Sequence, residues 1–140
     1  MKSNLLIALL AITLNAASIT VNISGIQTKD GFLRIILFSK AEGFPSNYTK
    51  GIRDTSIVTP EKSETVTFTN LPAGTYSVSV LHDRNGNKKM DSGMFGIPKE
   101  PWGVSNNVHP KTRVPKFEEC DFLLKSEEIK TVLITITLPK

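Results

Sequence analysis

Apolar and polar residues alternate in several short segments of this chain, and this period of two constrains its fold more than any other feature. Residues 19–23 and 65–69 alternate strictly, and residues 75–81 and 131–138 place their larger apolar side chains at every second position. Such alternation is typical of strands that bury one face. Residues 31–38 form a nearly continuous apolar run, which indicates a central strand buried on both faces.

No segment keeps an apolar stripe with helical spacing over three turns. Residues 41–53 contain Gly43, Pro45 and Gly51, and they predict at most a short helical turn inside a loop. Pro72 and Gly74 indicate a turn between two of the alternating segments. Short strands in a chain of this length, without an internal repeat, predict an all-β domain: an antiparallel, immunoglobulin-like β-sandwich with one long irregular loop.

The first eighteen residues have the pattern of a secretory signal peptide. Lys2 is followed by an apolar run over residues 5–14 and then by small residues up to Ser18. This run is shorter than the roughly 20 apolar residues of a membrane-spanning helix. We expect residues 1–18 to be a cleaved signal peptide and residues 19–140 to be a single domain, secreted or periplasmic and without a transmembrane segment. A membrane anchor or a buried first helix is the alternative.

The positive charge is concentrated in one irregular stretch. The chain has 17 Lys and Arg against 13 Asp and Glu, a formal net charge of +4. Residues 84–116 alone hold seven basic and two acidic residues, a local charge of +5, and four prolines lie between residues 92 and 116. Long connections of this kind are often functional. Export argues against nucleic acid as a partner, and it favours an anionic surface such as lipid head groups, or a polysaccharide.

Cys120 is the only cysteine, so the chain has no intramolecular disulfide. On a strand, Cys120 shares a face with Phe122 and Leu124, while Glu119 and Asp121 point to the other side. We therefore predict a buried structural residue on a strand and no thiol chemistry.

Residues 83–91 have the spacing of a calcium-binding loop. Oxygen-bearing side chains occupy positions 1, 3, 5 and 9, and a backbone carbonyl is expected at position 7. The candidate Ca²⁺ ligands are Asp83, Asn85, Asn87, the Lys89 carbonyl and Asp91. Position 6 is Lys88 where such loops have glycine, and position 12 is Met94 where they have glutamate. We expect a weak site, with a dissociation constant of about 0.1–1 mM. The alternative is a plain β-hairpin turn at Asn85-Gly86.

A second set of residues in the basic stretch is a candidate ligand surface. It consists of Phe95, Lys99, Trp102, Asn106 and Asn107. The alternative for the two aromatic residues is structural, because Phe95 and Trp102 could instead pack beneath the loop as a small separate core.

Catalytic groups have no recognisable spacing. Ser105, His109 and Asp91 are the residue types of a Ser/His/Asp hydrolase, and His82 is a second candidate base. The sequence has no nucleophile-elbow motif to support this activity. The two histidines also have no spacing typical of a transition-metal site. We expect a non-enzymatic binding module. The alternatives are a secreted hydrolase that uses His82 or His109 with Asp91, and a structural module that assembles through its sheet edges.

Three segments carry a resemblance to a known family. Residues 82–107 (HDRNGNKKMDSGMFGIPKEPWGVSNN), preceded by FTNLPAGTYSVSV at 68–80 and followed by VPKFEECDF at 114–122, resemble a bacterial exported family, domain of unknown function 2141. The resemblance extends from about Ile19 to Leu138, and it implies an exported protein with one β-sandwich domain and no assigned activity. The family usually has glycine at the position of Lys88. The LPAGTY element is also similar to transthyretin-like and carboxypeptidase-regulatory-like sandwiches.

Overall fold

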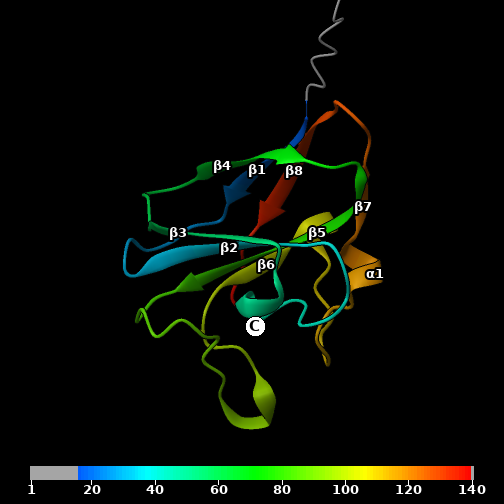
Figure 1. The fold of residues 1–140 in the computed structure, drawn as a ribbon. Helices are drawn as coiled ribbons and strands as arrows, with labels where there is room; N and C mark the ends of the chain where they lie inside the picture. Colours follow the sequence, from blue (N-terminus) through cyan, green and yellow to red (C-terminus); the bar gives the residue numbers. More distant parts are fainter. Residues whose placement is uncertain (1–15, 140) are drawn as a thin grey trace, which may run out of the picture.

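The computed structural model describes residues 16–139, which form two β-sheets with a shared core (Figure 1). Residues 1–15, most of the predicted signal peptide, lie outside the described residues, whereas its last two residues, Ala17 and Ser18, begin the first strand of the sandwich. The prediction of an all-β sandwich is confirmed. No helix within residues 16–139 has the length and apolar character needed to cross a bilayer.

The first sheet has three strands in the order β4-β1-β8, and the second contains β3-β2-β5-β6 with β7 also paired to β5. The first is built from β1 (Ala17–Ser24), β4 (Glu64–Leu71) and β8 (Ile129–Thr135). The second is built from β2 (Phe32–Phe38), β3 (Arg53–Val58), β5 (Gly74–Asp83), β6 (Trp102–Val104) and β7 (Phe122–Leu124). One helical turn, α1 (Phe117–Cys120), precedes β7.

The alternating side chains of both sheets form the core. Ile19, Val21 and Ile23 of β1 are buried against Leu33 and Ile35 of β2, together with inward residues of β4, β5 and β8. Each large aliphatic side chain buried in this way contributes about 1.5–3 kcal/mol. The apolar run of β2 is buried on its other face as well, where Ile36 and Phe38 pack on Phe44 and Phe117. This second cluster explains why β2 does not alternate.

One strand pair departs from the expected antiparallel arrangement. β1 and β8 run parallel, from Ser18 opposite Ile129 to Ser24 opposite Thr135. Alternation determines which residues of a strand face the core, and it carries no information on the direction of the neighbouring strand. Beyond β8, Thr137 pairs with Trp102 of β6 through two hydrogen bonds of 3.0 Å, and this joins the two sheets along one side.

The predicted strand around Cys120 is wrong in part. Cys120 is fully buried, as expected, but it ends α1, and the strand β7 begins only at Phe122. The side chain of Glu119 accepts a hydrogen bond of 2.8 Å from the Lys116 backbone N–H, which stabilises the helical turn. The burial of Cys120 is therefore confirmed, but the residue lies in a helical turn and not in a strand.

The end of β5 and the start of β2 lie together at one end of the second sheet. Phe32 pairs with Asp83, so the residues just before β2 lie beside those just after β5. Gly31 allows this close approach, because it has φ of +70° and a Cβ placed there would lie 2.0 Å from the Asp83 carbonyl oxygen. The long loop of residues 84–101 leaves the sheet from this point.

Candidate functional site

The loop of residues 84–101, which we call the basic loop, connects β5 to β6. Its two ends are held together, because the His82 backbone N–H donates to the Pro101 carbonyl at 2.9 Å and Leu81 pairs with Trp102. The alternative of a plain hairpin turn at Asn85-Gly86 is wrong, since β5 pairs with β6 beyond the whole loop.

Asp83 lies fully buried at the root of the basic loop. One of its carboxylate oxygens accepts a hydrogen bond of 2.7 Å from Arg34 Nε, and the Arg34 side chain is itself only 18% exposed. The carboxylate also accepts the backbone N–H groups of Asn87 at 3.1 Å and Lys88 at 2.9 Å. The chain therefore winds around this carboxylate, as it does around the first ligand of a calcium loop.

Two of the other predicted calcium ligands, Asn85 and Asn87, converge on the third, Asp91. The side-chain amides of Asn85 and Asn87 donate to its two carboxylate oxygens at 2.5 and 2.8 Å. The Oδ1 atoms of the same two asparagines accept the backbone N–H groups of Asn87 and Lys89 at 3.2 and 3.1 Å. The structure thus gathers the side chains that the spacing selected into one small cluster.

Lys88 adopts the backbone conformation that glycine has at the same position of calcium loops. Its φ is +68°, in the left-handed region that L-residues other than asparagine and aspartate rarely adopt. The winding of the loop is therefore retained although the glycine is missing, at a cost of about 1 kcal/mol.

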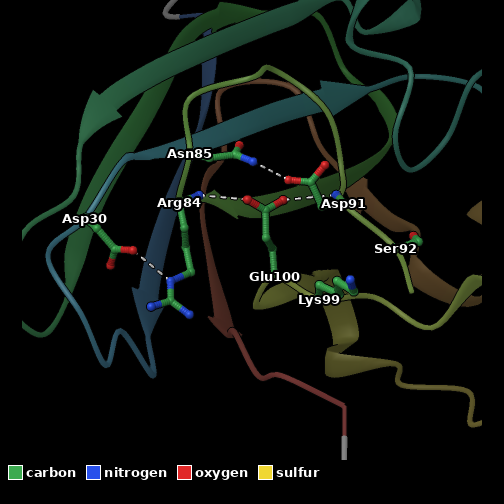
Figure 2. A pocket seen from close by; sticks show the side chains of 7 residues that line it. All are labelled: Asp30, Arg84, Asn85, Asp91, Ser92, Lys99 and Glu100. Atoms are coloured by element: carbon green, nitrogen blue, oxygen red, sulfur yellow. Dashed lines mark hydrogen bonds and ion pairs between the residues drawn. The ribbon is translucent and has the colours of Figure 1, made fainter. Parts of the chain in front are cut away.

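Glu100 is the residue of the site that sequence reasoning missed. Its side chain is 4% exposed, and its two oxygens accept the backbone N–H groups of Arg84 at 2.9 Å and of Asp91 at 3.1 Å (Figure 2). The carboxylate thereby links the beginning of the basic loop to the end of the calcium-like segment. The only local sequence feature that concerns Glu100 is Pro101, which favours extended backbone at the residue before it.

A polar hollow of about 500 Å³ lies beside these contacts (Figure 2). Arg84 and Asp30 lie side by side in its lining and form an ion pair of 2.8 Å. Hydrogen bonds from the Thr28 side chain and from Arg84 lower the pKa of Asp30 to about 2, so this carboxylate stays ionised into acid solution. The lining residues are Asp30, Arg84, Asn85, Asp91, Ser92, Lys99 and Glu100.

The predicted ligand surface does not form one patch. Phe95 is 93% exposed, so its packing into a small core beneath the loop is wrong. Trp102 is half-buried, and its ring packs against that of His109 at a centroid distance of 4.6 Å and a tilt of 47°. Of the five residues, Lys99 alone lines the hollow.

The two asparagines of that predicted surface fasten backbone segments to each other. Asn106 Nδ2 donates to the Asp121 carbonyl at 3.0 Å. Asn107 donates to the Leu133 carbonyl at 3.2 Å and accepts from the Thr135 N–H at 2.8 Å. Asn106 thus ties the segment after β6 to the residue between α1 and β7, and Asn107 ties it to β8.

The candidate catalytic side chains have structural partners. Nε2 of buried His82 donates a hydrogen bond of 2.7 Å to the Asp30 carbonyl oxygen. The Ser105 hydroxyl donates to the Cys120 carbonyl at 2.6 Å and accepts the Val78 N–H at 2.9 Å. Within residues 16–139, no hydrogen bond joins either histidine to Asp91 or Ser105, and no cluster of three His, Cys, Asp or Glu side chains around one metal position is found.

We expect Cys120 to resist alkylation in the folded protein. Burial, and then the charges of Glu119 and Asp121, raise the pKa of the thiol to about 12, so almost no thiolate exists at neutral pH. Intact-mass measurements should show rapid labelling by iodoacetamide in urea and none of the native protein over the same time. Comparable labelling rates with and without urea would contradict this expectation.

The fold and the site together define a class: a two-sheet β-sandwich with a long basic loop wound around a buried aspartate. The chain belongs to a bacterial family, domain of unknown function 2141, described as an uncharacterized protein conserved in bacteria, whose family model matches residues 21–132. No significant match is found among curated proteins or among solved structures.

Proposed function

We propose that this protein is an exported, non-enzymatic binding module whose basic loop is its contact surface and is stabilised by a weakly bound calcium ion. The observation that carries the proposal is the winding of residues 83–91 around the Asp83 carboxylate, with Lys88 in the left-handed conformation. The candidate ligands are the side chains of Asp83, Asn85, Asn87 and Asp91 and the carbonyl of Lys89.

The chemistry of these groups suits a hard cation. Calcium binds carboxylate, amide and carbonyl oxygens, and this segment supplies each kind. Binding requires the amides of Asn85 and Asn87 to rotate, since their nitrogens face Asp91. The exposed Lys88 and Lys89 reduce the local affinity for a cation, so we expect a dissociation constant of about 1 mM, as in extracellular modules.

A binding role is supported by the form of the site. The hollow beside the basic loop is open, and both positively and negatively charged side chains line it. The candidate nucleophile Ser105 is fully buried in the structure, and so is Cys120. Export is supported by the pattern of residues 1–18, and periplasmic and extracellular fluids can hold calcium at the concentration a weak site needs.

Calcium should raise the melting temperature. At ten times a dissociation constant of about 1 mM, binding adds about 1.4 kcal/mol, or about 4 °C for a domain of this size. Asp91→Asn should abolish the increase, and it leaves the buried ion pair of Asp83 with Arg34 in place. Lys88→Gly should enlarge it, because one positive charge beside the candidate site is lost.

Differential scanning calorimetry with and without calcium measures these shifts. Magnesium at the same concentration is the control, since Mg²⁺ demands a tighter octahedral site and loses water reluctantly. An unchanged melting temperature of the wild-type protein in calcium would overturn the calcium part of the proposal.

A further inference from the structure

The outer part of the basic loop is a narrow hairpin, residues 91–99, that projects from the end of the sandwich (Figure 1). Ser92 pairs with Pro98 at its base, and the hairpin is closed by backbone hydrogen bonds of 2.8 Å from Gly93 to Ile97 and from Lys99 to Asp91. We call this hairpin the tongue. A single helical turn of residues 94–96 forms its tip.

The tip of the tongue carries three apolar side chains in solvent. Met94 is 77% exposed, Phe95 is 93% exposed and Ile97 is 55% exposed, and no residue of the helical turn is buried. Scattered single apolar residues are normal on a protein surface, but three within four positions at a projecting tip form a group. Such a group marks a contact surface.

The backbone holds Phe95 outward under strain. Phe95 has φ of +58° and ψ of +22°, a left-handed conformation that is unfavourable for a bulky aromatic residue. The next residue, Gly96, also has positive φ, and nothing lies within 4 Å of a Cβ placed there. Backbone strain of this kind is concentrated at functional sites.

The basic loop also carries exposed lysines. Lys88, Lys89 and Lys99 are exposed, and an ideal Cβ on Gly93 of the tongue would lie 3.1 Å from the Lys99 side chain. The acidic neighbours are engaged elsewhere: Asp91 accepts both asparagine amides, and Glu100 is buried on two backbone N–H groups. A partner of the basic loop therefore meets exposed lysines as well as the apolar tip.

We propose that the tongue inserts its tip into the interface of an anionic lipid bilayer. Shallow insertion of a few apolar side chains, with lysines attracted to lipid phosphates at about 1 kcal/mol each, matches what the tongue presents. A stable protein interface instead needs about 800 Å² on each partner, and a narrow convex tip offers little area. This inference rests on the basic loop being the contact surface, and it does not require calcium.

Cosedimentation with vesicles tests the proposal. The wild-type protein should sediment with vesicles of equal parts phosphatidylcholine and phosphatidylglycerol, and should remain in the supernatant with phosphatidylcholine alone. The triple variant M94S/F95S/I97S should bind at least about tenfold more weakly, because the inserted apolar area is gone. The variant K88Q/K89Q/K99Q and high salt should each weaken binding by at least about tenfold.

Ile129→Ser is the matched control. Ile129 is 77% exposed, as is Met94, but it lies at the first residue of β8, at the other end of the molecule from the tongue (Figure 1). This variant should bind vesicles like the wild type.

Two results would overturn the membrane proposal. The first is that the wild-type protein binds neither kind of vesicle, which would favour a protein partner for the tip. The second is that the triple serine variant binds vesicles as strongly as the wild type. Repeating the assay in calcium and in a chelator separates the two proposals. If the protein binds vesicles but calcium does not change its melting temperature, the membrane proposal stands and the calcium proposal fails.

Discussion

Replacing Asp83 with alanine is expected to lower the free energy of unfolding by about 3–5 kcal/mol. Its carboxylate is fully buried, and it accepts Arg34 Nε together with two backbone N–H groups of the basic loop. The variant leaves the Arg34 guanidinium, 18% exposed, without its partner, and it leaves the N–H groups of Asn87 and Lys88 without acceptors. Urea unfolding followed by circular dichroism measures the change.

A double-mutant cycle separates the ion pair from the loop contacts. Arg34→Met removes the charge partner but leaves both N–H bonds to Asp83, so its cost should be smaller than that of Asp83→Ala. The double variant Asp83→Ala with Arg34→Met should cost less than the sum of the single variants, because no unpaired buried charge remains. A loss below about 1 kcal/mol for Asp83→Ala would mean that this ion pair does not hold the root of the loop.

Much of the fold could be predicted because the core strands alternate. Ile19, Val21 and Ile23 point to one face in the sequence pattern and are buried in the structure. β3 was not predicted because residues 53–58, RDTSIV, are mostly polar, and the strand lies at an edge where little of it is buried. An edge strand of this kind is identified by its hydrogen bonds to β2, and the local pattern of apolar residues does not predict these bonds.

The candidate site divides in the same way. The spacing of Asp83, Asn85, Asn87 and Asp91 is local, and the structure brings these side chains together. Arg34 and Asp30 could not be predicted as partners, because they lie 49 and 54 residues from the groups they bind and are placed by the register of β2 on β5. Sequence patterns thus found the loop, and tertiary pairing supplied the charges that anchor it.

The second large effect is expected at Glu100, which closes the basic loop. Glu100→Ala should lower the free energy of unfolding by about 3–6 kcal/mol, since two hydrogen bonds are lost and each hydrogen bond to a charged group is worth about 1.5–3 kcal/mol. Glu100→Gln keeps one acceptor oxygen and should lose about half as much. Glu118→Ala, which removes an exposed glutamate of α1, should change stability by less than about 0.5 kcal/mol.

Hydrogen exchange shows which backbone amides lose protection when Glu100 is replaced by alanine. If its carboxylate joins Arg84 to Asp91, both backbone N–H groups should exchange faster in Glu100→Ala, while the strand amides of β1 keep their relative protection. Because Asp91 is a candidate calcium ligand, the same variant should also reduce the calcium-dependent rise in melting temperature without removing any ligand. Unchanged exchange at Arg84 and Asp91 would show that the loop is closed by its other contacts, the pairing of β5 with β6 and the winding around Asp83.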